Sequence, residues 1–173
     1  MLDERGIYER LCLEGFQSGL SWLTILRKRE AFRAAFAGFD PELVAGFGKR
    51  EVGRLLGDVG IVRHRGKIEA AIANARGTLA LRGAGTPLAE LFWAHRPEPG
   101  PALRSLAEVP ATTHESIVLA KALRQSGFRF VGPTTVYAAM QACGVVNDHL
   151  VGCPARAPTE RALAGVTLPA SGV

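Results

Sequence analysis

Apolar residues recur at intervals of three and four along most of this chain, which is the spacing of one face of an α-helix. Residues 7–16 predict a first helix that ends near Gly19. Ser21 is a suitable N-cap for a second helix that starts with Trp22. Because Gly15 has no side chain, it lets another backbone or a ligand approach the first helix. The chain is therefore expected to open with two helices separated by a tight break.

The remaining helices are marked by their ends. Asp40 and Pro41 combine an N-cap residue with proline at the first helical position, and they predict a short helix to about Phe47. Helical periodicity predicts further helices at about residues 50–56, 66–82, 88–95, 113–126 and 133–143. Strand patterns are nearly absent. The fold class predicted is all-α, a compact multi-helix domain of seven or eight helices.

The domain is expected to comprise residues 1–153. After Cys153 the chain is rich in Pro, Ala and Thr with weak periodicity, so residues 154–173 are predicted to form a mostly disordered tail. No internal repeat and no phosphate-cradling Gly-x-x-x-x-Gly-Lys loop occurs in the sequence.

Composition narrows the class of protein. With 173 residues, of which 47% are hydrophobic, the chain can bury one proper core. No apolar run is long enough to span a bilayer, and the N-terminus lacks the apolar core of a signal peptide. Three cysteines without paired spacing fit a reducing compartment. We therefore expect a cytoplasmic protein. We also expect a monomer, an expectation that does not come from the composition.

The charge favours an anionic partner. A net charge of +5 and an isoelectric point near 9.6 are typical of proteins that bind nucleic acid. The abundance of Arg, Ala and Gly also fits a bias in nucleotide composition, so charge alone does not decide between these interpretations.

A carboxylate and an aromatic residue flank the break between the first two helices. Glu14 lies within an otherwise apolar helical run, and Trp22 follows the break at Gly19. This pattern indicates a pocket for a flat ligand with polar edges. The alternative is a buried acid that accepts a hydrogen bond from a backbone amide, with Trp22 as an ordinary core residue. These residues alone favour the alternative.

A second informative stretch joins the helices predicted at 50–56 and 66–82. Two helices linked by a short turn bounded by glycines are a candidate helix-hairpin-helix element, in which backbone N–H groups at the start of the second helix bind phosphate. The alternative is an ordinary loop with solvated basic residues. The crowding of basic groups favours contact with the DNA backbone. The residues concerned are Gly60, Arg63, His64, Arg65, Gly66 and Lys67.

The third stretch contains His149 and Cys153. Their separation of four allows an imidazole and a thiolate to bind one metal ion, but a structural zinc site needs four ligands. The other cysteines and histidines form no second pair at ligand spacing. Spacing alone therefore favours coincidence.

Taken together, these stretches resemble the 3-methyladenine DNA glycosylase I family. The segments are Leu-Glu-Gly-Phe-Gln-Ser-Gly-Leu-Ser-Trp (13–22), Gly-Ile-Val-Arg-His-Arg-Gly-Lys-Ile (60–68) and Met-Gln-Ala-Cys-Gly-Val-Val-Asn-Asp-His-Leu-Val-Gly-Cys (140–153). They occur in the order and approximate spacing of the family. The resemblance covers about residues 7–153, which is nearly all of the predicted domain.

The resemblance implies a helix-hairpin-helix glycosylase that acts in base excision repair by removing 3-methyladenine from alkylated double-stranded DNA. Glu14 matches the acid that hydrogen-bonds the excised base, and it is the candidate catalytic residue. Trp22 matches an aromatic residue of the base pocket. Gly19 and Leu20 match the turn that faces the gap left by the flipped nucleotide, with Leu20 as the candidate plug. Residues 60–67 match the phosphate-binding hairpin.

The resemblance also implies a structural zinc ion, for which His149 and Cys153 match half of the ligands. Family members share a segment with Cys-x-Trp, Tyr-His-Asp and Glu-Trp-Gly motifs that precedes the first helix, and this chain begins after it. Two zinc ligands and a pocket tyrosine are therefore expected to be missing. Either the start codon is assigned too late, or the chain is a shortened homologue.

Two features of the hairpin region predict a monofunctional hydrolase. The long helix at 66–82 contains no Asp, so the carboxylate that many helix-hairpin-helix glycosylases present nearby is absent. Lys67 is interpreted as a phosphate contact and not as a Schiff-base nucleophile. The competing hypothesis is a non-catalytic helix-hairpin-helix DNA-binding module. A small basic helical protein without a role at DNA would require all three motif matches to be chance.

Overall fold

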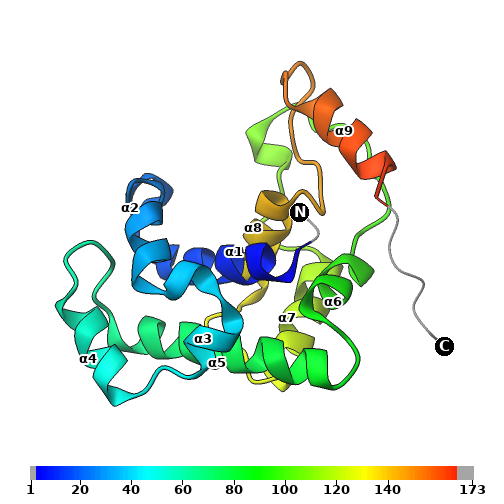
Figure 1. Ribbon diagram of the computed structural model, residues 1–173. Coiled ribbons are helices and arrows are strands. Elements are labelled where there is room, and N and C mark those ends of the chain that lie inside the picture. Colours follow the sequence, from blue (N-terminus) through cyan, green and yellow to red (C-terminus); the bar gives the residue numbers. More distant parts are fainter. Residues whose placement is uncertain (1–2, 167–173) are drawn as a thin grey trace.

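The computed structural model describes residues 3–166, and this part of the chain contains helices but no strand (Figure 1). The all-α prediction is therefore confirmed. None of the described helices is both long and apolar enough to cross a membrane. The helices are α1 (Glu4–Gln17), α2 (Trp22–Ala35), η1 (Ala37–Phe39), α3 (Pro41–Ala45), α4 (Lys49–Gly57), α5 (Arg65–Gly83), α6 (Leu88–Ala94), η2 (Leu106–Glu108), α7 (His114–Gln125), α8 (Pro133–Cys143) and α9 (Arg156–Ala164).

Helix boundaries follow local capping. Asp3 accepts a hydrogen bond from the amide of Gly6 at 2.6 Å, so α1 begins three residues before the predicted start. Ser21 caps α2 as predicted, since its hydroxyl accepts from Thr24. Asp40 accepts from the amides that follow Pro41 and starts α3 where the sequence indicated.

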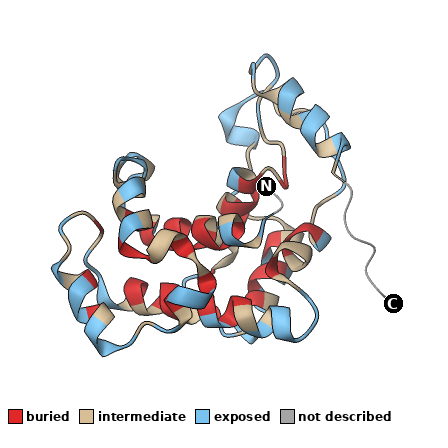
Figure 2. Cartoon of the chain, in the orientation of Figure 1, coloured by how far each residue is buried: buried red, intermediate tan, exposed pale blue. Residues whose placement is uncertain are grey.

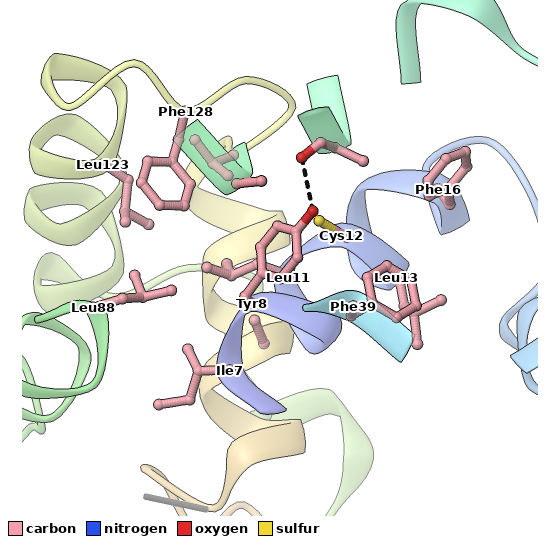
Figure 3. Packing of buried hydrophobic residues seen from close by; sticks show 14 of the residues in the cluster. Ile7, Tyr8, Leu11, Cys12, Leu13, Phe16, Phe39, Leu88, Leu123 and Phe128 are labelled. Atoms are coloured by element: carbon pink, nitrogen blue, oxygen red, sulfur yellow. Dashed lines mark hydrogen bonds between the residues drawn. The ribbon is translucent and has the colours of Figure 1, made fainter. Parts of the chain in front are cut away.

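Helix α1 lies at the centre of the fold and contacts α2, α5, α6 and α8, which makes it the most buried helix (Figure 2). The hydroxyl of Tyr8 donates to the carbonyl oxygen of Ala71 at 2.9 Å and so joins α1 to α5 within the core (Figure 3). Burial raises the pKa of the Cys12 thiol to about 12, so this cysteine is an inert core residue.

An aromatic cluster holds α2 against α1. The ring of Phe16, in the last turn of α1, lies 4.6 Å from the ring of Phe32, and the stacked rings of Phe36 and Phe39 continue the cluster. All four rings are buried. Aromatic contacts of this kind add about 0.5–1.5 kcal/mol each beyond the area that they bury. The two helices that carry Glu14 and Trp22 are therefore fixed relative to each other.

The segment after Cys153 differs from its prediction. Residues 156–164 form helix α9, so the disordered tail predicted there is wrong; the last residues, 167–173, lie outside the described part. Arg96 donates to the carbonyl of Leu163, and Asn147 donates to the carbonyl of Arg156. Periodicity did not indicate α9 because the helix buries no residue and is tied down mainly by polar contacts from other segments.

Candidate functional site

Glu14 lies in the penultimate turn of α1 with only 7% of its surface exposed. Within residues 3–166 no N–H group donates to its carboxylate and no cation lies within ion-pair distance, so the alternative of a backbone-satisfied acid finds no support. Burial raises the pKa of Glu14 to about 7, and the charge of Arg10, one turn earlier, partly opposes this shift. Burial of a charged side chain is costly, and raised carboxyl pKa values are common at functional sites, so Glu14 stays the candidate catalytic residue.

The turn between α1 and α2 is closed by hydrogen bonds and exposed to solvent. Gly19 has φ of +79°, a left-handed conformation that glycine adopts without strain. Gln17 closes the turn, because its carbonyl accepts from the amide of Leu20 at 2.7 Å and its side chain donates to the carbonyl of Leu20 at 2.8 Å. The side chain of Leu20 is 40% exposed. The turn thus presents an apolar side chain to solvent, as a plug requires.

Trp22 follows this turn as the first residue of α2, half-buried and packed against the core. The fold therefore brings Trp22 to within one short turn of the helix that carries Glu14. That the two side chains line one base pocket stays a prediction. Two cavities of about 490 and 520 Å³ lie beside α9, and neither Glu14 nor Trp22 lines them.

The predicted hairpin consists of α4, a loop over residues 58–64, and α5. Helix α5 begins at Arg65, one residue earlier than predicted, because His64 caps it through Nδ1, which accepts from the amide of Lys67 at 3.2 Å. His64 therefore serves the protein's own structure as the N-cap of α5.

Close packing surrounds the backbone at Gly60. Its amide donates to Asp58 at 2.7 Å, and a Cβ at this position would lie 3.1 Å from the Cβ of Ala31 on α2. The ammonium of Lys28, also on α2, donates to the carbonyls of Val59 and Gly60. A side chain at position 60 would therefore crowd Asp58 and α2.

The solvent-facing part of the hairpin is basic. Arg63 and Arg65 are exposed, and Arg65 forms an ion pair of 3.6 Å with Glu69 that water screens. Gly66 follows in the first turn of α5. These groups surround the start of a helix of 19 residues, a position that favours anions. That the element is a helix-hairpin-helix motif stays a prediction.

The position of the Lys67 side chain differs from the one interpreted from the sequence. Its ammonium is buried, with the residue 8% exposed, and it donates to the carbonyls of Phe16 and Ser18 at 2.9 and 2.5 Å. Burial lowers its pKa. The prediction that Lys67 contacts phosphate is therefore wrong. Lys67 binds the C-terminal carbonyls of α1 and so joins the hairpin to the turn that carries Leu20.

His149 and Cys153 are neighbours in space, with 3.7 Å between Nδ1 and Sγ. Two ligands on one tetrahedral zinc ion are separated by about 3.6 Å, so the pair has the geometry of half a site. Residues 3–166 contain no group of three His, Cys, Asp or Glu side chains that could hold a metal. The donors present in the described residues do not complete a structural zinc site.

Two residues of this region were missed in the sequence. Asn74 on α5 is 2% exposed, and its side chain both accepts from the amide and donates to the carbonyl of Arg129. The clamped segment presents Phe130, whose ring contacts the ring of His64. The available signal for Asn74 was a polar residue on the apolar face of a helix. Phe130 had no signal, because its neighbours come from distant segments.

The comparisons with known proteins agree with this arrangement. The family model for methyladenine glycosylases matches residues 1–157, and the chain belongs to that family. DNA-3-methyladenine glycosylase 1 of Escherichia coli is 49% identical over 87% of this chain and 82% of its own length. The DNA-3-methyladenine glycosylase of Haemophilus influenzae is 42% identical over 89% of this chain and 84% of its own.

A solved structure supports the fold. 3-Methyladenine DNA glycosylase I of Staphylococcus aureus, whose structure describes the basis of 3-methyladenine recognition, is 34% identical. It superposes with a TM-score of 0.86, covering 90% of this chain and 84% of its own. The resemblance seen in three short motifs therefore extends to the family model and to the fold.

Proposed function

We propose that this protein is a monofunctional DNA glycosylase that excises 3-methyladenine from alkylated double-stranded DNA in base excision repair. The observation that carries the proposal is Glu14, a buried residue whose carboxylate has no hydrogen-bond or ion-pair partner among the described residues. Membership in the methyladenine glycosylase family and the names of its relatives support the same substrate.

The charge of the lesion explains the selectivity. Methylation at N3 makes the adenine of the nucleotide a cation, whereas normal adenine is neutral. An ionised Glu14 in a poorly hydrated site attracts the cation more strongly than it would in water. Binding of the cation also favours the charged form of a carboxyl group whose pKa burial has raised to about 7. Trp22 adds a ring face on which the flipped purine stacks, a cation–π contact.

The reaction is a hydrolysis. The bond between C1′ and N9 breaks, and its electron pair goes to the base, which leaves as neutral 3-methyladenine. The oxygen of water forms the new bond to C1′ and releases a proton to solvent. Glu14 stabilises the positive charge on the sugar as the base departs. Lys67 is held by two carbonyls and is not presented to C1′, so the hairpin offers no amine for a Schiff base.

The DNA must deliver its base to this site. The target nucleotide leaves the stack, since a base inside a duplex is inaccessible. Leu20 fills the gap from the exposed turn, and the start of α5 with Arg63 and Arg65 holds the backbone. We propose that the protein acts as a monomer in the cytoplasm, with His149 and Cys153 available to zinc only as a half-site.

Release of free 3-methyladenine from methylated duplex DNA tests the proposal. We expect release without strand cleavage by the chain and little release by Glu14→Gln, which keeps the shape of the side chain and removes its charge. A matched control is Glu98→Gln, at an exposed glutamate after α6. Binding of duplex DNA without release would support the non-catalytic DNA-binding module instead. Full activity of Glu14→Gln would remove the role assigned to Glu14.

A further inference from the structure

Phe130 is an exposed aromatic residue in a strained backbone conformation. It is 40% exposed, and its φ of +56° lies in the left-handed region, which bulky residues rarely adopt. Such strain persists only where surrounding structure enforces it, and it concentrates at functional sites. An apolar ring that is kept exposed to solvent at a cost in stability is expected to contact a ligand.

The surrounding structure does enforce this conformation. Asn74 forms two hydrogen bonds with the backbone of Arg129, the residue before Phe130. On the same segment, Phe128 packs on Gly77 of α5, where a Cβ would lie 2.6 Å from its ring. Val131, on the other side, is buried. Phe130 therefore projects from a segment whose neighbours are fixed in the core.

Phe130 lies between the two places where the proposed substrate is held. A Cβ on Gly15, the residue after Glu14, would lie 3.4 Å from the Cβ of Phe130. A Cβ on Gly66, at the start of α5, would lie 3.9 Å from the edge of the Phe130 ring. The same ring meets that of His64 edge-on, with 6.3 Å between centroids. The side chain thus extends from the helix of Glu14 to the phosphate-binding end of the hairpin.

The position of the Phe130 ring indicates which part of a bound nucleotide it would contact. In a nucleotide the deoxyribose connects the phosphate to the base. If the hairpin binds a phosphate and Glu14 receives the base, the sugar passes over the residue between them. We propose that Phe130 is a positioning residue whose ring packs against the deoxyribose of the extruded nucleotide and so places C1′ for attack by water. The inference rests on the proposed glycosylase function.

Substitutions in the full chain test this role. Phe130→Ala removes the ring, Phe130→Tyr keeps it, and Leu43→Ala removes an equally apolar exposed side chain on α3. Three quantities are measured: single-turnover release of 3-methyladenine from methylated duplex DNA, the affinity for free 3-methyladenine, and the melting temperature. The free base has no sugar, so its affinity does not depend on a contact with deoxyribose.

We expect Phe130→Ala to slow release about tenfold, the size of a lost ring contact with a nucleotide, while free-base affinity and melting temperature stay unchanged. Phe130→Tyr and Leu43→Ala are expected to keep the original rate. Phe130→Gly, which relieves the positive φ, should be as slow as Phe130→Ala without losing stability.

Release by Phe130→Ala at the original rate would overturn the role of Phe130 and leave the glycosylase function standing. The role would also be overturned if Phe130→Ala lowered the rate of release, the affinity for the free base and the melting temperature together, because the ring would then only support the fold. Absence of release by the unaltered protein would overturn both proposals.

Discussion

Replacement of Glu14 by glutamine is expected to make the protein more stable as it becomes less active. The carboxyl group is buried without a partner among the described residues, so its ionised form destabilises the folded state. Glutamine has nearly the same shape and no charge to desolvate. Stability gained at an active-site residue with loss of activity is the trade-off expected of a group retained for function.

The size of the gain follows from the pKa. Burial raises the pKa of Glu14 from its ordinary value of 4.5 to about 7. Because the folded state then binds more protons than the unfolded state between these values, stability is greatest below pH 4.5 and falls as the pH rises through 7. At about 1.4 kcal/mol for each pKa unit, this shift corresponds to about 3.5 kcal/mol. Because solvent screens part of the charge, the cost at pH 8 is expected to be at most about 3 kcal/mol. Glu14→Gln avoids this cost.

Denaturant unfolding and thermal unfolding, each at pH 5 and pH 8, measure the effect. The two proteins should differ little at pH 5, and Glu14→Gln should be more stable at pH 8, with a melting temperature up to about 6–12 °C higher. Glu98→Gln removes a carboxylate from the surface and should show no comparable gain. A difference between Glu14→Gln and the original protein that does not change with pH would refute the reasoning.

Three further changes test other parts of the structure. Lys67→Met should destabilise the protein by about 1–3 kcal/mol in urea unfolding, because it removes the hydrogen bonds to two carbonyls, and it should leave the salt dependence of DNA binding unchanged. Arg63→Ala should instead lower the slope of log K against log salt by about 1. The reverse pattern would restore Lys67 as the phosphate contact. Gly77→Ala should cost about 1–3 kcal/mol in the same assay through its clash with the ring packed on it, and unchanged stability would contradict that packing. EDTA should leave the melting temperature unchanged, since His149 and Cys153 supply only two ligands, and a large decrease would reveal a complete metal site.

Local signals in the sequence were sufficient to place most helices. Ser21 and Asp40 cap α2 and α3 through hydrogen bonds to amides two or three residues further on. Such contacts depend on neighbouring residues alone, so a sequence pattern reveals them. The same holds for Gly19, whose left-handed turn separates α1 from α2. The family resemblance was likewise contained in three short segments.

The roles of particular side chains depended on the tertiary structure. The carbonyls that bind Lys67 come from residues 49 and 51 positions earlier, and Asn74 clamps a segment 55 positions later. Nothing near Lys67 in the sequence distinguishes a buried cation from a phosphate contact. The sequence also does not reveal that the Glu14 carboxylate lacks a partner among the described residues, or where Phe130 lies. Both depend on segments that meet only in the folded chain.

The sequence by itself determined most of the helices, the family and the residue types available for chemistry, because caps and periodicity act within a few residues. Only the tertiary structure decided which charge is buried, which is exposed and which ring lies between α1 and the start of α5. The physical reason is that desolvation and packing depend on every segment that surrounds a side chain, wherever that segment lies in the chain.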